Sequence, residues 1–286
     1  MTDIRFRTVA VLGAGTMGAG IAQVSAQAGS NVVLQDIETR FVDKGMQRIR
    51  DSLAVGVQKQ KLTQAEADAT LGRITTSIDR KGAVRSADLV IEAVPEILDL
   101  KQSLFAEISA NSRPECVLAT NTSSLSLQKV FAQATNPGRC IGMHYFNPPP
   151  IMKLLEVVRT AATSEATIDA VKAYAVQCGK EPILVKDSPG FASSRLGVCL
   201  GLEAIRMVEA AVASPEDIDK AMVLGYGHPM GPLKLTDLVG LDVRMAIADY
   251  LRDELDHPGF VVPDLMRKMV AEGKLGKKSG QGFYRW

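Results

Sequence analysis

The sequence of 286 residues lacks long apolar runs and any strong excess of one charge. No segment has the apolar length of a signal peptide or a membrane-spanning helix, so we expect a cytoplasmic protein that does not associate with membranes. Lysine and arginine together number 33, aspartate and glutamate 32, and a net charge of +1 gives no reason to expect nucleic-acid binding. The chain is long enough to bury a full core and to divide into two domains.

Cysteine and histidine are also scarce. The four cysteines are widely spaced and form no Cys-x-x-Cys motif: Cys116, Cys140, Cys178 and Cys199. We therefore predict no metal site and no redox pair, and expect small buried thiols instead. The histidines are His144, His228 and His257, so any catalytic histidine is one of these three.

A glycine-rich turn near the start of the chain is the most informative feature. Residues 9–12 are an apolar run that predicts a buried strand, and a helical pattern covers residues 16–28. The turn and the start of the helix contain Gly13, Ala14, Gly15, Thr16, Met17 and Gly18. Gly13 suits a tight turn, Gly15 lets the backbone approach a pyrophosphate, and Gly18 lets the helix pack closely on the strand. Because the first N–H groups of that helix would point at the phosphates, the segment predicts a dinucleotide site.

A carboxylate at the end of the next apolar run supports this interpretation. Residues 31–36 are predicted to form a second strand that ends in Asp36. This carboxylate would accept hydrogen bonds from the ribose hydroxyls and repel a 2′-phosphate, which favours NAD over NADP. Arg40 follows closely, and because a basic residue there often accommodates NADP, the second cofactor stays as the less favoured alternative.

The sequence up to residue 186 alternates short apolar runs with helical patterns. This alternation predicts an α/β fold with a Rossmann-type, doubly wound parallel sheet. Further strands are expected over residues 88–93, 116–119, 140–144, 154–158 and 183–185. Helices are expected from Asp36 to about residue 61, and over residues 95–110 and 164–178.

The strand pattern stops near residue 187. We expect an NAD-binding domain over residues 1–186 and an all-helical domain over residues 187–286. The helices predicted for the second domain cover residues 191–213, 215–224, 233–255 and 261–272. This domain is too small to bury much apolar surface alone, so we expect it to pack on the first domain or on another subunit.

Three polar clusters follow predicted strands, at residues 92–96, 121–124 and 144–147. Ligands of open α/β sheets bind at the carboxyl ends of the strands, so we expect these clusters to converge. His144 is the natural general base, because imidazole titrates near neutral pH. Glu156 lies inside an apolar run and needs a partner if it is buried, and His144 is the obvious candidate. In the alternative interpretation, His144 is a hydrogen-bonded core residue and Glu156 faces solvent.

Two further groups of side chains also allow two interpretations. Ser123 and Ser124 could donate hydrogen bonds to a substrate oxygen, or one of them could cap the helix that follows. The basic residues of the second helix are Arg48, Arg50, Lys59 and Lys61. They could bind phosphates, although a solvated helix face is the commoner role of such residues.

These motifs, taken together, resemble the L-3-hydroxyacyl-CoA dehydrogenase family, and within it the short 3-hydroxybutyryl-CoA dehydrogenases. The resemblance covers nearly the whole chain. It is carried by Gly-Ala-Gly-Thr-Met-Gly at 13–18, Glu-Ala-Val-Pro-Glu at 92–96, Asn-Thr-Ser-Ser at 121–124, His-Tyr-Phe-Asn-Pro at 144–148, Lys-Leu-Leu-Glu at 153–156, Asp-Ser-Pro-Gly-Phe at 187–191, Gly-Pro-Leu at 231–233, Asp-Leu-Val-Gly-Leu-Asp at 237–242 and Lys-Ser-Gly-Gln-Gly-Phe-Tyr at 278–284.

The resemblance implies NAD-dependent, reversible oxidation of (S)-3-hydroxyacyl-CoA in fatty acid metabolism. It makes His144 the catalytic base and Glu156 the acid that orients it. It places Ser123 on the 3-oxygen of the substrate and Asn147 between nicotinamide and substrate. Residues implied to contact the cofactor are Asp36, Glu96, Lys101 and Lys278, and those implied to contact coenzyme A are Ser52 and Lys59. The family is dimeric through its helical domain, which also closes over the substrate, so a homodimer is expected.

One position departs from the family pattern. The family usually has asparagine in the active site where this chain has Ser194. Serine is shorter and has no amide, so it could keep a hydrogen bond through closer approach or could mark a shifted substrate preference. Two alternatives therefore stay open: a dehydrogenase of a free sugar acid such as gulonate, and an NAD-binding protein without catalytic activity.

Overall fold

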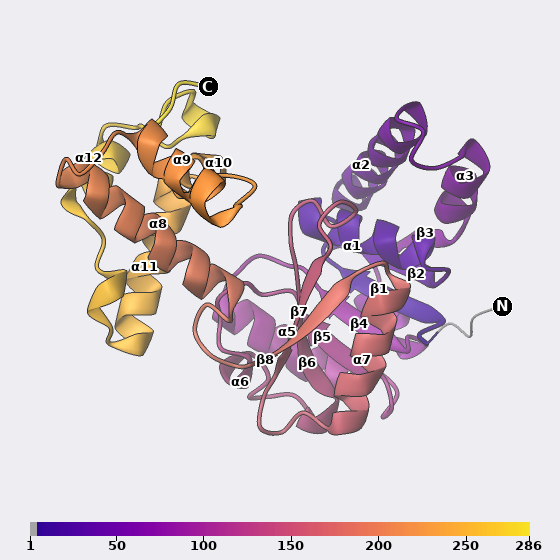
Figure 1. Ribbon diagram of the computed structural model, residues 1–286. Helices are drawn as coiled ribbons and strands as arrows, with labels where there is room; N and C mark the ends of the chain where they lie inside the picture. The colour runs from indigo at the N-terminus through magenta and orange to yellow at the C-terminus, as the bar shows by residue number, and fades with distance from the viewer. Residues whose placement is uncertain (1–4) are drawn as a thin grey trace. The chain divides into compact units, whose positions relative to one another are not determined.

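The computed structural model describes residues 5–286, which divide into two compact units (Figure 1). The first unit ends at Ser188 and the second extends from Pro189 to Trp286. The division falls next to the position where the strand pattern of the sequence stops. No helix in the described range is long and apolar enough to cross a membrane.

The first unit contains one sheet of eight strands in the order β3-β2-β1-β4-β5-β6-β7-β8. Neighbouring strands are parallel except β6 and β7, which are antiparallel. The chain begins in the middle of the sheet and builds outward in both directions, so the predicted doubly wound Rossmann-type fold is confirmed. The strands are β1 (Thr8–Leu12), β2 (Asn31–Gln35), β3 (Ile74–Ser77), β4 (Leu89–Glu92), β5 (Val117–Thr120), β6 (Cys140–Tyr145), β7 (Leu154–Arg159) and β8 (Glu181–Lys186).

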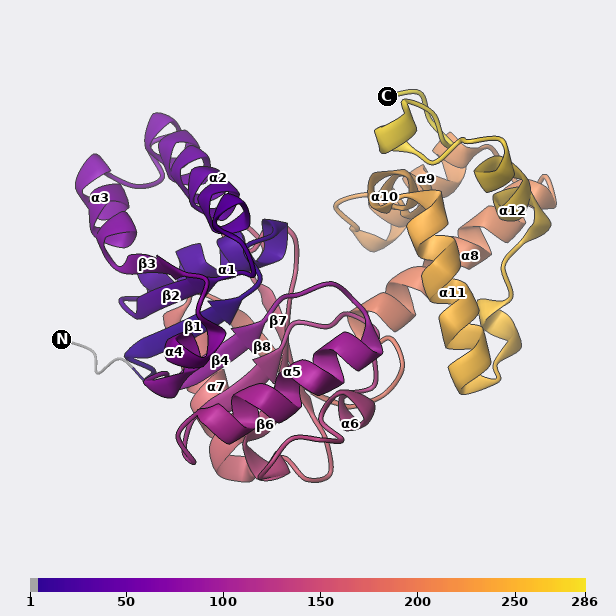
Figure 2. The ribbon, with the colours of Figure 1, turned by 180° about the vertical axis from the view of Figure 1, so that it is seen from behind.

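Helices cover both faces of this sheet. Helix α7 lies in front of the sheet in Figure 1, whereas α5 lies in front in the reverse view of Figure 2. The central strands are therefore buried on both sides, which explains why β1, β4 and β5 are continuous apolar runs. The helices of this unit are α1 (Thr16–Gln27), α2 (Thr39–Gln58), α3 (Gln64–Gly72), α4 (Arg80–Arg85), α5 (Leu98–Asn111), α6 (Leu127–Val130) and α7 (Glu165–Gln177).

Three of these elements, α3, β3 and α4, were not predicted from the sequence. Only Ile74 of β3 is buried, so this short edge strand has no apolar alternation to detect. Helix α3 buries only Ala67 and Thr70. Its start is marked by a capping box, in which Thr63 accepts from the Glu66 N–H and the Glu66 carboxylate accepts from Thr63. That Thr-x-x-Glu pattern was the available sequence signal.

The second unit is a helical domain, as predicted, although isolated antiparallel β-bridges pair Gln281 with Gly276 and with Arg285 near its end. Its α-helices are α8 (Ser193–Glu209), α9 (Pro215–Tyr226), α10 (Pro232–Val239), α11 (Leu241–Leu255) and α12 (Asp264–Ala271). The single helix predicted over residues 233–255 is wrong. Gly240 has φ of +101°, which ends α10 and changes the chain direction before α11. The expectation that this unit buries little apolar surface alone is also wrong, because Leu202, Ile205, Leu233 and Leu251 belong to a core of its own.

Candidate active site

The glycine-rich turn joins β1 to α1. Gly13 has φ of +100°, a conformation that favours glycine, and its N–H donates to the Gln35 carbonyl at 2.8 Å. A Cβ atom on Gly18 would lie 1.7 Å from the Gly13 carbonyl oxygen. The turn and the helix that follows it can therefore approach this closely only with glycine at these positions.

The same turn fits a dinucleotide. A Cβ atom on Gly15 would meet no other atom within 4 Å, so the backbone borders open space there. Gly15 is also the N-cap of α1 and offers no side chain to the first N–H groups of the helix, which leaves them to an anionic ligand. Asp36 follows β2, and its Oδ2 accepts the Ala14 N–H at 2.7 Å. The carboxylate expected on the ribose is thus fixed beside the turn.

Arg40 is the residue for which NADP stayed the less favoured alternative. It pairs with the Glu38 carboxylate at 2.9 Å. The guanidinium also lies over the Phe41 ring, with its carbon 4.8 Å from the ring centroid. Both members of the ion pair are exposed, so the pair is weak, but its geometry directs Arg40 toward its own helix.

A buried ion pair lies where β4 ends. Lys101 is 1% exposed, and its Nζ lies 2.6 Å from Glu92 Oε1 and 3.2 Å from Glu96 Oε2. Glu92 also accepts hydrogen bonds from the Val94 N–H and the Thr120 hydroxyl. The lysine therefore compensates a fully buried carboxylate and links it to the more exposed Glu96. The family resemblance implied roles for Glu96 and Lys101 but none for Glu92, although the place of Glu92 at the end of an apolar run was a signal that it is buried.

Glu96 organises the loop after β5. Its Oε1 accepts hydrogen bonds from the Thr122 hydroxyl, the Ser123 N–H and the Ser124 hydroxyl. Burial would raise the pKa of Glu96, but the Lys101 ammonium and these hydrogen bonds outweigh it and hold that pKa below its ordinary value. The carboxylate is thus ionised at neutral pH and keeps the loop in place.

The two serines of this loop do not cap a helix. Helix α6 is capped by Ser126, whose hydroxyl accepts from the Lys129 N–H. The capping interpretation of Ser123 and Ser124 is therefore wrong for both residues. Ser123 uses only its backbone N–H in the contact with Glu96. Its hydroxyl makes no hydrogen bond to another residue of the described chain and lines a cavity.

The cavity contains the side chain of His144. The Cα atoms of His144 and Glu156 are paired between β6 and β7, and Nδ1 of the imidazole lies 2.7 Å from Glu156 Oε2. His144 is 6% exposed and Glu156 is fully buried, so the interpretation that Glu156 faces solvent is wrong. The ring of Phe146 packs at a centroid distance of 4.6 Å from the imidazole. Two neighbours therefore fix the orientation of the histidine ring.

The polar clusters at the ends of β4, β5 and β6 converge on this cavity of about 360 Å³. Its lining comes from Met17 of α1, Ala93, Val94 and Glu96 after β4, Lys101 of α5, Asn121 and Ser123 after β5, and residues 144–147. The side-chain amide oxygen of Asn121, Oδ1, accepts the Tyr145 N–H at 2.9 Å and thereby ties two of the clusters together. The predicted convergence at the carboxyl ends of the strands is thus observed.

A second cavity, of about 270 Å³, lies along α1 and α2 and shares Asn147 with the first. It is lined by Ser52 and by Arg48. Lys59 is the C-cap of α2, is exposed and does not line this cavity. The structure therefore brings Ser52 and Asn147 to one cavity and leaves Lys59 apart from its lining.

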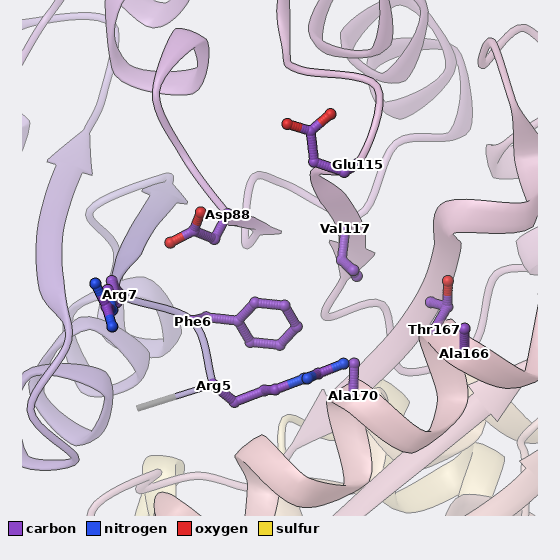
Figure 3. A pocket seen from close by; sticks show the side chains of 9 residues that line it. All are labelled: Arg5, Phe6, Arg7, Asp88, Glu115, Val117, Ala166, Thr167 and Ala170. Atoms are coloured by element: carbon purple, nitrogen blue, oxygen red, sulfur yellow. The ribbon is translucent and has the colours of Figure 1, made fainter. Parts of the chain in front are cut away.

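A larger cavity, of about 460 Å³, lies at the opposite edge of the sheet, where β1, β4 and β5 begin (Figure 3). Arg5, Asp88 and Glu115 line it together with the side of α7. It contains none of the predicted site residues. Because ligands of such sheets bind at the carboxyl ends of the strands, the cavity around His144 is the better candidate despite its smaller volume.

Two predicted site residues belong to the second unit. Ser194 lies in the first turn of α8. Lys278 donates from Nζ to Asp242 Oδ2 at 2.7 Å, and this hydrogen bond is the main reason why the pKa of Asp242 lies below its ordinary value. No cluster of potential metal ligands is present among residues 5–286.

Comparisons with known proteins agree with these observations. The model of the 3-hydroxyacyl-CoA dehydrogenase NAD-binding domain matches residues 8–188, and that of the C-terminal domain matches residues 190–286. The 3-hydroxybutyryl-CoA dehydrogenase of Mycobacterium tuberculosis is 44% identical over 97% of this chain and 98% of that protein. A crystal structure of (S)-3-hydroxybutyryl-CoA dehydrogenase from Ralstonia eutropha has a TM-score of 0.94 at 43% identity, over 98% of this chain and 99% of that chain.

These matches extend over both units, and the first unit corresponds to a domain that binds NAD. The resemblance inferred from the motifs is confirmed: the chain belongs to the 3-hydroxyacyl-CoA dehydrogenase family.

Proposed function

We propose that the protein oxidises (S)-3-hydroxyacyl-CoA, with 3-hydroxybutyryl-CoA as a substrate, to 3-ketoacyl-CoA with NAD, and that the reaction is reversible. The observation that carries this proposal is the pair of His144 and Glu156 in the cavity next to the glycine-rich turn. The names of relatives that are more than 40% identical support the acyl-CoA substrate.

His144 acts as the general base. Glu156 holds Nδ1, so the other ring nitrogen exchanges the proton of the 3-hydroxyl group. The carboxylate stabilises the imidazolium that forms, and it does so in a dry environment where charges interact strongly. The Ser123 hydroxyl steadies the charge that develops on the 3-oxygen. Bound NAD supplies the acceptor for the hydride that leaves C3.

Other residues of the chain bind the two ligands. The turn from Gly13 to Gly18 and Asp36 hold the pyrophosphate and the adenosine ribose of NAD. Glu96, Lys101, Asn147 and Lys278 complete the cofactor site. Ser52 and Lys59 contact coenzyme A, the first of them in the cavity that also contains Asn147. Ser194 contacts the substrate in place of the family asparagine.

The second unit serves in substrate closure and in dimerisation. Its surface exposes the large apolar side chains of Val212, Leu224 and Tyr226, of which the last two are about four-fifths exposed. Exposed apolar side chains of this size on one small unit favour a second copy of the chain as their partner. Light scattering coupled to size-exclusion chromatography would give the mass of a dimer, and a monomer mass would contradict this part of the proposal.

The function is tested by following NADH absorbance with acetoacetyl-CoA, with free acetoacetate and, using NAD, with gulonate. Rapid oxidation of NADH with acetoacetyl-CoA alone is expected. Activity only with a free acid would favour the sugar-acid alternative. Binding of NADH without turnover of any of the three compounds would favour a protein without catalytic activity.

A further inference from the structure

The loop between β6 and β7 carries Asn147 and has few backbone donors of its own. Residues 148–150 are three consecutive prolines, which have no backbone N–H. The next two N–H groups of the chain, those of Ile151 and Met152, both donate to the Pro148 carbonyl at 3.0 Å. Any other buried carbonyl of the loop therefore needs a donor from elsewhere in the fold.

Lys180 supplies that donor. Its Nζ donates to the Pro149 carbonyl and, at 2.8 Å, to the Met152 carbonyl. The side chain is 6% exposed, and no carboxylate among residues 5–286 pairs with it. Burial lowers the pKa of Lys180, so an amine at this position has a cost in free energy. The two carbonyls of the loop are the groups that compensate this cost.

The backbone of Lys180 is itself fixed where α7 ends. Gly179 has φ of +68°, and the Lys180 N–H donates to the Ala175 carbonyl at 2.9 Å, as in the Schellman motif. The N–H of the next residue, Glu181, donates to the Lys153 carbonyl at 2.9 Å, where β8 joins β7. The lysine side chain therefore extends from a backbone that hydrogen bonds hold on both sides.

The loop also packs on α1. A Cβ atom on Gly20 would lie 2.7 Å from Pro149 Cδ, so only glycine admits the proline ring there. Residues 147–150 line the cavity along α1 and α2, and Asn147 also lines the cavity of His144. Within the described chain, the only side-chain hydrogen bonds to residues 147–152 come from Lys180. The position of Asn147 between the two cavities therefore depends on this lysine.

We propose that Lys180 is a positioning residue, which fixes the loop of residues 147–152 so that Asn147 reaches both nicotinamide and substrate. The inference rests on the proposed function, because the role of Asn147 comes from there. Lys180 lines neither of the two cavities, so it acts through the loop and not by contact with a ligand. The lysine, the loop and both cavities belong to the first unit.

A cycle of single and double variants tests whether Lys180 acts through Asn147. Lys180→Met and Asn147→Ala should each lower kcat/KM for acetoacetyl-CoA by about tenfold or more, because a displaced contact is lost much as a deleted one is. The double variant should be at most about threefold worse than Asn147→Ala alone, since one contact can be lost only once. Lys180→Arg, which keeps a charged donor, should lose less. Lys172→Met, which changes an exposed lysine of α7, is the matched control and should keep the wild-type kcat/KM.

Hydrogen exchange measures the loop directly and does not depend on the reaction. In Lys180→Met, the N–H groups of Ile151 and Met152 should exchange about threefold faster or more than in the wild type, because the turn that protects them opens more often. The N–H groups of β1 should keep their exchange rates, which would show that the fold is intact.

Three results would overturn the inference: losses that multiply in the double variant, a wild-type kcat/KM in Lys180→Met, or unchanged exchange in the loop. A wild-type protein without activity on acetoacetyl-CoA would instead count against the proposed function, and the exchange measurement would still test whether Lys180 anchors the loop. If Lys180→Met does not fold, Lys180→Gln, which keeps an amide donor without the charge, replaces it in the cycle and in the exchange measurement. Multiplying losses or unchanged exchange would contradict the inference there as well.

Discussion

His144 and Glu156 face each other directly across the antiparallel strands β6 and β7, although twelve positions separate them in the chain. The strand register places the two side chains on the same side of the sheet, and the buried carboxylate holds the imidazole at Nδ1. The orientation of the proposed base is therefore set by the pairing of two strands of the sheet and not by a loop.

Removing either side chain should impair the chemical step more than cofactor binding. His144→Ala should lower kcat by roughly 100-fold or more, because the proton then has no acceptor in the site. Glu156→Gln should also lower kcat, since the amide cannot stabilise an imidazolium. Steady-state kinetics with acetoacetyl-CoA and NADH fluorescence titration measure the two effects. An alanine variant at position 144 that kept most of its activity would contradict the assignment.

The buried pair of Lys101 and Glu92 gives a prediction about stability. Lys101→Met leaves the fully buried Glu92 without a counter-charge, so the free energy of unfolding should fall by about 3–5 kcal/mol. The double variant Lys101→Met with Glu92→Gln should recover part of this loss, because no charge is then buried. Urea denaturation measures both, with the exposed Lys172→Met as control, for which a change within about 0.5 kcal/mol is expected. Equal losses in the single and double variants would show that the charge is not the cause.

Most of the first unit could be predicted from its sequence because its apolar runs are strong and its glycine-rich turn is specific. The prediction of secondary structure failed for elements and boundaries that no apolar pattern marks. Helix α3 and strand β3 bury few side chains, and α10 and α11 have a continuous helical pattern that only the positive φ of Gly240 interrupts. Nothing in the spacing of His144 and Glu156 gave their register, because that depends on β7 being antiparallel to β6.

Glu96 should make the stability of the protein depend on pH in the acid range. Its pKa in the folded protein lies below the ordinary value of 4.5, so the ionised carboxylate stabilises the fold above that pH. This stabilisation is lost as the pH falls through the lower, folded pKa. Glu96→Gln should therefore have a lower Tm than the wild type at neutral pH, and the plots of Tm against pH for the two proteins should converge in acid. Plots that stay parallel over the whole pH range would contradict the role given to Glu96.

The cofactor preference should depend on the charge of Asp36. Asp36→Asn keeps an oxygen that can accept the Ala14 N–H but removes the charge that would repel a 2′-phosphate. The ratio of kcat/KM for NADH to that for NADPH should therefore fall by at least about tenfold in the variant. Asp68→Asn, which changes an exposed acid of α3, is the control and should keep the ratio. If Asp36→Asn discriminates between the two cofactors as the wild type does, the cofactor preference arises at another residue. Arg40, which pairs with Glu38 and is directed toward its own helix, then becomes the next residue to change.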